Sequence, residues 1–526
     1  MSLSSKSAIT KLQAVLLLVV LVLAVGAGVA YYNLTVRPPT VKVLKIGIGT
    51  DADTLDPAGQ TTTLVQNIVN FMYQTLVYQD EKGQVKPLLA TAWNVSSDGL
   101  VYTMKLRRDV KFHDGTPFDA SIVKFTMDRV LDPNVRVPLR AYITMLDRTE
   151  IIDPYTVRLV LKFPFAPFIP VLSLVSWAMV LPSAVQKYGD KFAENPVGTG
   201  PFKFKEWVKG DRIVLERNEN YWGDKATFDQ VIFRIVPEAG TRVSMLLAGD
   251  VDMIYKPSPA DLPKLQANPD VVVSTVDSTR TIFIAINNQF GPFKDKRVRQ
   301  ALNYAVDKES IVKNILLGLA TVYDSPVPSS FFGHASIGAY PYDPAKAKQL
   351  LKDAGYPTGF KTVLISPSGR YTLDIQMAQA VQGYLKDVGI DAEVRTMDWP
   401  TYIATITKPL NETNVELHVL GWGPFVLDAD QTLSAMFNSA YWPPQGLATA
   451  FYKNVQVDKL INDARMSIDP KVRQDLYAQA QKIIMDDAPW IFMYIEKFTL
   501  AWRKPLKGVI VFPFETFDIT YAKFEQ

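Results

Sequence analysis

The hydrophobic and polar positions divide the chain into an apolar N-terminal segment and a long body in which strand-like and helix-like patterns alternate. Residues 12–32 carry no charged side chain. At about 1.5 Å per residue, a helix of this length spans roughly 30 Å, the thickness of the apolar core of a bilayer. We therefore expect residues 12–32 to be a transmembrane anchor or, alternatively, a cleaved signal peptide, since Gly28 and Ala30 place small residues at a cleavage position.

The charges before this segment predict its orientation. Lys6 and Lys11 precede it, and positive charge favours the cytoplasmic side, so residues 1–11 are expected in the cytoplasm and the body outside the cell. Residues 33–40, which include two prolines, are expected to be a linker. The protein is thus predicted to be a single-pass cell-membrane protein with a large extracellular domain, or a secreted protein if the segment is cleaved.

Periodicity in the body predicts an α/β fold. The apolar run 43–48 ends at a glycine, as a buried strand does. Apolar residues recur at helical spacing over 298–306, which predicts a helix with one buried face. Asp343 followed by Pro344 predicts the start of another helix. A helix around 375–385 that leads into a strand at 390–394 completes the alternation typical of an α/β assembly.

Composition and motifs argue against catalysis, metal binding and nucleic-acid binding. The chain has 526 residues, no cysteine, and 56 basic against 53 acidic residues. This excludes disulfides and thiolate sites, and no basic block marks a nucleic-acid surface. Its three histidines are far apart in sequence, and no GxSxG motif is present. We therefore expect neither an enzyme nor a bound cofactor or metal ion.

Several longer motifs resemble one protein family. They are KLRRDVKFHDGTPFDASIVKF at 105–125, PVGTGPF at 196–202, NENYW at 218–222 and RVRQAL at 297–302. The chain resembles family 5 of the extracellular solute-binding proteins, the dipeptide, oligopeptide and nickel-type receptors of ABC transporters. With its N-terminal segment it is similar to membrane-anchored archaeal members.

The resemblance implies a periplasmic-binding-protein-like fold of class II, the type with three subdomains, in which a hinge joins two lobes around a ligand cleft. Lobe I is expected to comprise 41–285 and 497–526, with an inserted subdomain at about 65–195. Lobe II is expected to comprise 286–496. The resemblance also implies a monomer.

The resemblance further implies a receptor that captures di- or oligopeptides and delivers them to a membrane permease driven by cytoplasmic ATPases. An oligosaccharide ligand is the alternative within the same family. A membrane-anchored hydrolase or a sensor is the alternative from another functional class.

The segment 421–430 is the expected far wall of the cleft. Peptide-binding relatives commonly have an aspartate where this chain has Phe425, and that carboxylate pairs with the ammonium group of the ligand. Either Asp428 or Asp430 takes over this task, or the ligand has no free ammonium, because an unpaired charge in a closed cleft is costly. Both aspartates are alternatively caps of a following helix. The same Asp-Ala-Asp run stands where nickel-binding relatives have a histidine, which argues against nickel.

The other expected ligand contacts lie on both sides of the cleft. Trp422, Gly423 and Phe425 belong to the wall, and aromatic rings there suit apolar peptide side chains and sugars alike. Trp399 is a further aromatic candidate. Arg370, in a Gly-Arg turn, could pair with a ligand carboxylate, with a solvated surface arginine as the alternative. The resemblance places Thr50 and Asp53 in the lobe I wall. His113 and His418 are interpreted as structural.

Overall fold

The computed structural model describes residues 15–25, 41–59 and 62–525. The chain divides into two compact units, Met1–Val43 and Leu44–Gln526. In the first unit, residues 15–25 are helical with exposed side chains, while 12–14 and 26–32 of the expected membrane segment lie outside the described residues. Among the residues that are described, no helix has the length and apolarity needed to span a bilayer.

One mixed sheet runs through the whole body. Its strands, in spatial order, are β15 (Asp391–Met397), β14 (Lys361–Pro367), β16 (Leu417–Trp422), β12 (Val271–Ile286), β17 (Trp490–Arg503), β11 (Met253–Tyr255), β1 (Val43–Ile48), β10 (Gln230–Ile235), β9 (Arg212–Arg217) and β8 (Phe202–Val208). A further strand, β13 (Ala320–Val322), also pairs with β17. The strand predicted at 43–48 is confirmed as β1, and the mixture of parallel and antiparallel pairs confirms the α/β class.

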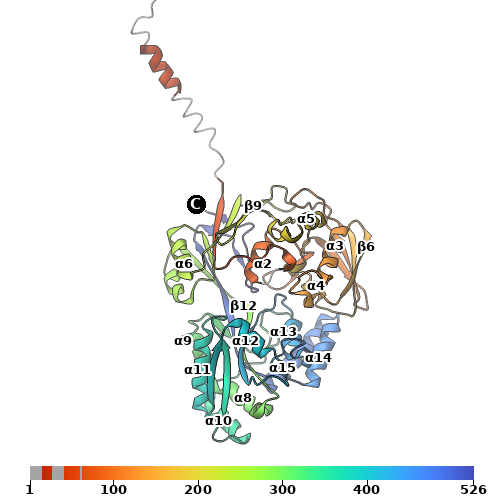
Figure 1. The fold of residues 1–526 in the computed structure, drawn as a ribbon, viewed down its shortest axis with the longest axis vertical. Coiled ribbons are helices and arrows are strands. Elements are labelled where there is room, and N and C mark those ends of the chain that lie inside the picture. Colours follow the sequence, from red (N-terminus) through yellow and green to blue (C-terminus); the bar gives the residue numbers. More distant parts are fainter. Residues whose placement is uncertain (1–14, 26–40, 60–61, 526) are drawn as a thin grey trace, which may run out of the picture. The chain divides into compact units, whose positions relative to one another are not determined.

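The two longest strands belong to both halves of this sheet. β12 and β17 are antiparallel along most of their length, and their register shifts between Asp277 and Thr281. Before the shift, side chains pack with one set of hydrophobic cores, and after it with another. We call these parts lobe I and lobe II. In Figure 1 the helices α2 to α6 gather on one side of β12, and α8 to α15 gather on the other.

Lobe I adds a second, four-stranded sheet to its part of the main sheet. This antiparallel sheet has the order β4 (Ala90–Val95), β5 (Val101–Leu106), β7 (Thr156–Leu161) and β6 (Leu146–Asp153), and α3 (Ala120–Leu131) packs against it. The other elements of lobe I are α2 (Thr63–Asn70), α4 (Phe168–Val171), α5 (Pro182–Tyr188), α6 (Ala239–Ala248), α7 (Leu262–Gln266), β2 (Val77–Gln79) and β3 (Val85–Pro87).

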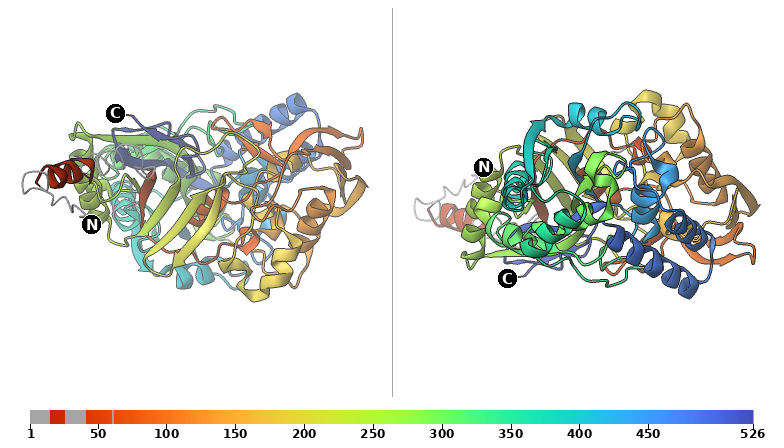
Figure 2. Two further views of the ribbon diagram at one scale, coloured as in Figure 1. Left: turned by 90° about the horizontal axis from the view of Figure 1, so that it is seen from above. Right: turned by 90° about the horizontal axis from the view of Figure 1, so that it is seen from below.

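The chain returns to lobe I after β17. Its last strands are β18 (Leu506–Lys507), β19 (Ile510–Val511), β20 (Phe517–Asp518) and β21 (Lys523–Phe524). Leu506, Phe517 and Ile519 are buried in the lobe I core. Figure 2 shows this dark blue C-terminal segment beside the strands of lobe I. The domain boundaries expected from the sequence stay a prediction, because the body forms one compact unit.

Lobe II consists of helices around the other part of the sheet. They are α8 (Lys296–Ala305), α9 (Lys308–Asn314), α10 (Pro344–Asp353), α11 (Asp374–Asp387), α12 (Trp399–Ile406), α13 (Asp430–Phe437), α14 (Val455–Met466) and α15 (Pro470–Asp487). The capping prediction is confirmed, since the Asp343 side chain accepts the N–H of Lys346 at the start of α10. The apolar face predicted over 298–306 is likewise buried.

His113 and the glycines of the 196–202 motif join two distant segments of lobe I. The backbone N–H of Gly198 donates to Nδ1 of His113 at 3.2 Å, and Nε2 donates to the carbonyl of Gly200 at 3.1 Å. Burial lowers the pKa of His113 to about 4, which keeps the ring neutral and suited to both bonds. His113 therefore connects these two segments of lobe I by hydrogen bonds, as the structural interpretation expected.

We predict that Gly198→Ala destabilises the protein severely. A Cβ at this position would lie 2.0 Å from the carbonyl oxygen of Met72. Because the clashing atoms of Met72 belong to the backbone, a side-chain rotation cannot relieve the clash. The expected loss is about 3 kcal/mol or more in the free energy of unfolding, measured by urea denaturation.

Gly383→Ala is the matched control, since Gly383 lies inside α11 with nothing within 4 Å of the added Cβ. It should stabilise the protein by about 0.5–1 kcal/mol. Equal effects of the two substitutions would contradict the packing described for the 196–202 motif.

Candidate functional site

The wall segment 421–430 begins where β16 meets the register shift of β12. Thr281 of β12 faces Trp422 in the sheet, and its Oγ1 donates to the Trp422 carbonyl at 3.2 Å. The N–H of Gly421 donates to the hydroxyl of Tyr371 at 2.8 Å, and a Cβ on Gly421 would lie 2.6 Å from that tyrosine ring. Sheet pairing and a glycine thus fix the start of the wall against the junction of the lobes.

A cluster of charged residues lies directly behind the wall. A Cβ on Gly423 would lie 3.1 Å from Cζ of Arg280, so the glycine allows the guanidinium to pack closely against the wall. Nε of Arg280 donates to Glu515 at 3.1 Å and lies 3.8 Å from Glu496. Lys256 donates to the other oxygen of Glu515 at 2.7 Å. These four residues come from β12, β17, the end of β11 and the C-terminal segment.

Charge compensation favours the ionised forms of Glu515 and Arg280. Burial by itself raises the pKa of Glu515, but Arg280 and Lys256 outweigh it and lower that pKa to about 2. The nearby Glu515 carboxylate raises the pKa of Arg280. The cluster therefore connects the shared strand β12 to the C-terminal segment through permanent charges.

Asp428 is engaged inside lobe II. Nη2 of Arg473, on α15, donates to both of its oxygens at 2.8 and 2.7 Å, and only 2% of the Asp428 side chain is exposed. Oδ1 also accepts the N–H of Asp430, the first residue of α13. Burial raises the pKa of Asp428, and the Arg473 guanidinium opposes that rise.

The Asp430 side chain is likewise bound by residues of lobe II. Asp430 is itself the first residue of α13, it accepts a bond of 2.6 Å from Oγ of Ser434, and it lies 3.3 Å from Nε of Arg465. Its side chain is 2% exposed. A ligand ammonium could take either aspartate only by breaking a buried ion pair, which is strongly unfavourable.

Arg370 has no such partner. Its side chain is exposed, and its Cζ lies 4.8 Å from the Trp399 ring centre and 5.6 Å from that of Tyr371. Within the described part of the chain, no carboxylate lies within ion-pair distance of its guanidinium. Trp399 in turn packs edge-on against Tyr371, with ring centres 6.1 Å apart. Arg370 is thus held over two rings beside the start of the wall.

Phe425 and Val426 reach from lobe II into lobe I. Val426 is fully buried in the lobe I core, and Phe425 packs against that core. The N–H of Ala166 in lobe I also donates to the carbonyl of Arg465 in lobe II at 2.8 Å. The two lobes are therefore in direct contact beside the wall.

Phe425 lines a cavity of about 610 Å³ whose other lining residues belong to lobe I; we call it the Phe425 cavity. The lobe I lining comes from α2 with the loop after it, β2, the NENYW motif and the C-terminal segment. Lobe II contributes only Phe425. Access to the cavity therefore depends on how the wall lies against lobe I.

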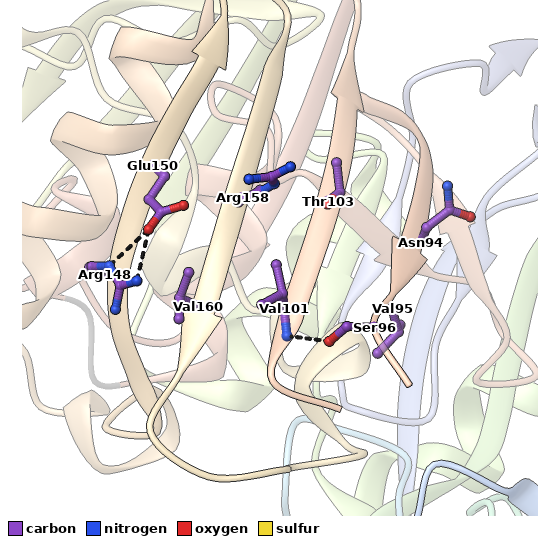
Figure 3. Close-up of a pocket in the computed structure, with 9 residues that line it drawn as sticks. All are labelled: Asn94, Val95, Ser96, Val101, Thr103, Arg148, Glu150, Arg158 and Val160. Atoms are coloured by element: carbon purple, nitrogen blue, oxygen red, sulfur yellow. Dashed lines mark hydrogen bonds and ion pairs between the residues drawn. The ribbon is translucent and has the colours of Figure 1, made fainter. Parts of the chain in front are cut away.

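A second hollow, of about 440 Å³, lies on one face of the four-stranded sheet of lobe I (Figure 3). Its lining residues are Asn94, Val95, Ser96, Val101, Thr103, Arg148, Glu150, Arg158 and Val160. Two of its charged side chains, Arg148 and Glu150, pair with each other. It takes no residue from lobe II, so contact between the lobes does not complete it.

The remaining predicted residues lie apart from this wall in the described contacts. Thr50 and Asp53 are exposed in the loop after β1. The neighbouring Asp51 binds Nε1 of Trp207 and the N–H of Gly210, which fixes that loop to lobe I. Thr50 and Asp53 stay predictions as ligand contacts. Sequence reasoning missed Arg280, Tyr371 and Glu515, because only the fold brings them together.

No metal centre is visible in the described residues, where no three His, Cys, Asp or Glu side chains gather closely enough to hold an ion. His418 is buried on β16, and its Nε2 lies 2.7 Å from Oγ1 of Thr449. Burial lowers the pKa of His418 to about 3. This ring is a packed core residue.

Two lobes joined by shared strands, with a wall of one lobe seated against the other, define a receptor that encloses a solute. The sequence profile described as "Bacterial extracellular solute-binding proteins, family 5 Middle" matches residues 84–443. The chain belongs to this family of solute-binding proteins of ABC transporters. It is a binding protein and not an enzyme.

Related proteins match this chain along nearly its whole length. The glutathione-binding protein GsiB of Pectobacterium atrosepticum is 36% identical over 504 residues, which cover 94% of this chain and 98% of that protein. The structure of HbpA2 from Haemophilus parasuis matches with a TM-score of 0.84 and 27% identity, covering 92% of this chain and all of the other. DppA from Helicobacter pylori, solved with the peptide STSA, matches with a TM-score of 0.76 and 29% identity, covering 94% and 100%.

We predict that Arg473→Met destabilises the protein by about 3–5 kcal/mol, because it leaves the buried Asp428 carboxylate without its partner. Chemical denaturation measures the loss. Arg395→Met is the control: Arg395 pairs with Glu393 on the exposed surface, and its replacement should leave the free energy of unfolding unchanged. An unchanged stability of Arg473→Met would contradict the structural role of this pair.

We also predict that His418 makes the fold sensitive to acid. Its folded pKa of about 3 lies below the ordinary value of 6.5, so the unfolded chain binds a proton more readily between these values. The stability associated with the neutral ring is complete above pH 6.5 and is lost as the pH falls toward 3. His418→Gln should lose less stability than the wild type between pH 7 and pH 4; identical slopes would contradict this account.

Proposed function

We propose that this chain is the receptor of an ABC importer for short peptides, and that Arg370 binds a carboxylate of the ligand. The observation that carries the proposal is the distribution of charge along the wall. Asp428 and Asp430 are both buried and paired with arginines of lobe II, whereas Arg370 has its guanidinium exposed over Trp399. The charge that the wall of lobe II offers a ligand is therefore positive.

The geometry around Tyr371 supports a carboxylate site. Burial raises the pKa of Tyr371, and Arg370 and Arg280 both oppose that rise, so both guanidinium groups lie near its ring. The planar fork of an arginine matches a carboxylate in two parallel hydrogen bonds. A ligand carboxylate beside Tyr371 would interact mainly with the charge of Arg370, because Arg280 is already paired with Glu515 and Glu496.

The relatives support a peptide ligand. The glutathione-binding protein GsiB is similar to this chain over nearly its whole length, and the matching DppA structure contains a peptide. Glutathione is a modified tripeptide with two carboxylates and one ammonium group. A wall that offers positive charge fits such a ligand, and we take glutathione as the first compound to test.

An oligosaccharide fits this wall less well. Sugar binding of the usual kind needs an open aromatic face. Trp399 lies under Arg370 and edge-on to Tyr371, and Trp422 is held by a 3.0 Å bond from its Nε1 to the Gln431 carbonyl. The Trp399 ring is thus covered by Arg370 on one face, and the Trp422 ring is fixed at its edge.

We propose that this receptor delivers its ligand by the transport route that its family implies. The receptor acts outside the cell as a monomer and passes its ligand to a permease with cytoplasmic ATPases. Residues 12–32 target the body to the exterior, as a transmembrane anchor or as a signal peptide. Their uncharged length supports this role, and mass spectrometry of the native protein would distinguish an intact from a cleaved N-terminus.

Isothermal titration of the full-length protein in detergent tests the ligand class. We expect binding of glutathione or of trialanine, and no binding of maltotriose. Binding of the sugar without either peptide would contradict the peptide assignment and restore the saccharide alternative.

We predict that Arg370→Ala weakens peptide binding by about 10–100-fold, because a charge-assisted hydrogen bond to a carboxylate is lost. Arg370→Lys should recover part of the affinity, since it keeps the charge without the fork. Arg395→Ala, which removes an exposed lobe II arginine that lies outside the site, should bind as the wild type does. Equal affinities for the Arg370 and Arg395 variants would contradict the role of Arg370.

A further inference from the structure

The exposed face of the four-stranded sheet in lobe I carries a row of side chains that begins at Asn94. In the strand register, Asn94 of β4 faces Thr103 of β5. Thr103 in turn faces Arg158 of β7, which faces Glu150 of β6. Residues directly opposite each other on neighbouring strands share one face of a sheet. All four line the hollow of about 440 Å³ in Figure 3, which we call the sheet hollow.

A second row lies beside the first on the same face. Ser96 donates its N–H to the carbonyl of Val101 at 2.9 Å, and Val101 faces Val160 of β7. Val160 in turn faces Arg148 of β6. Because side chains two positions apart share a face, Asn94 and Ser96 both border the sheet hollow. An antiparallel sheet commonly keeps one face in water, so the hollow by itself indicates no occupant.

The sequence supplies an occupant for this face. Asn94, Val95 and Ser96 form an Asn-x-Ser triplet, the acceptor of N-linked oligosaccharides in exported proteins, and the family is extracellular. The Asn94 side chain is exposed, and within the described residues its amide forms no hydrogen bond. Of the two other such triplets, 411–413 lies in a turn and borders neither the sheet hollow nor the Phe425 cavity, and 33–35 lies outside the described residues. Asn94 therefore combines an exposed acceptor with an adjoining hollow.

The lining of the sheet hollow suits an oligosaccharide. Sugar rings have apolar C–H faces, and Val95, Val101 and Val160 offer partly exposed apolar surface that gains from leaving water. Arg158 is exposed and pairs with no carboxylate in the part of the chain that the structure describes, so its guanidinium can donate to sugar oxygens. The first row crosses three strand spacings, about 14 Å from β4 to β6. A short oligosaccharide attached at Asn94 can therefore extend along the hollow.

We propose that Asn94 carries an N-linked oligosaccharide whose first sugars lie on the sheet hollow. In the transfer, Nδ2 of Asn94 attacks C1 of a sugar that is joined through phosphate to a membrane lipid. The C1–Nδ2 bond forms, the bond from C1 to the phosphate oxygen breaks, its electron pair leaves with that oxygen, and Nδ2 loses one proton. In the folded chain, Oγ of Ser96 donates to Asp98 at 2.5 Å, so the transfer takes place on the exported chain before this turn forms.

Peptide mass spectrometry of the protein isolated from the organism that produces it tests the attachment. The peptide containing Asn94 should be heavier than its sequence by a sum of sugar masses, with fragmentation locating the addition on Asn94. Asn94→Gln and Ser96→Ala, expressed in the same organism, should lose this mass, whereas Ser96→Thr should keep it, because either hydroxyl completes the triplet. Unmodified Asn94, including the case in which only Asn411 is modified, would overturn the proposal.

Two of these variants separate attachment from folding. Asn94→Gln leaves the turn bonds of Ser96 in place, so a loss of the sugar mass in this variant reports on the acceptor itself. Asn314→Gln is the matched control, since Asn314 is an exposed asparagine of α9 outside any such triplet. It should leave the mass on Asn94 unchanged. A sugar mass that persists in Asn94→Gln would assign the modification to another residue and contradict the proposal.

A cysteine probe tests whether the sugars lie on the sheet hollow. The chain contains no cysteine, so Thr103→Cys introduces a single thiol directly opposite Asn94. A maleimide should label this thiol at least about 5-fold more slowly in the glycosylated protein than in the Asn94→Gln background, because the attached oligosaccharide is bulky. Lys361→Cys, at a lobe II side chain that is 90% exposed, should be labelled at the same rate in both backgrounds. Equal rates at position 103 would refute the placement of the sugars.

Discussion

The structure depends on one arrangement above all, the ion cluster of Arg280, Glu496, Glu515 and Lys256 at the place where β12 and β17 change register. The sheet continues from one lobe into the other through these two strands. Where their register shifts, part of the backbone lacks regular pairing between the strands. Arg280, Glu496 and Glu515 are largely buried, so a displacement that separates them leaves a charge without its partner at a high cost. The cluster therefore fixes the C-terminal segment of lobe I, the shared strand and the glycine-rich start of the wall with respect to one another.

Ion pairs within lobe II also determine which charges of the wall are exposed. The two acids that follow Phe425 pair with Arg473 and Arg465, whereas the Arg370 guanidinium lies exposed near the Trp399 ring. In the proposed function, the wall therefore offers its ligand a positive charge and contributes Phe425 to a cavity of lobe I.

Much of the fold could be predicted from the sequence because its signals are local. The Asp343 cap, the apolar face at 298–306 and the strand at 43–48 each depend on neighbouring residues. The site could be predicted only in part. Trp422, Gly423 and Phe425 stood out in a glycine-flanked turn, but the partners of Asp428 and Asp430 come from other helices 45 and 35 positions away, and no periodicity signals such pairs. Arg280 and Glu515 are 235 positions apart. The expected membrane segment lies largely outside the described residues.

A crystal structure of the protein with bound glutathione tests the central claim most directly, since it shows which side chains contact the ligand. The account predicts a ligand carboxylate at the Arg370 guanidinium, with the Asp428–Arg473 and Asp430–Arg465 pairs intact. A ligand ammonium paired with Asp428 or Asp430, with its arginine displaced, would contradict it.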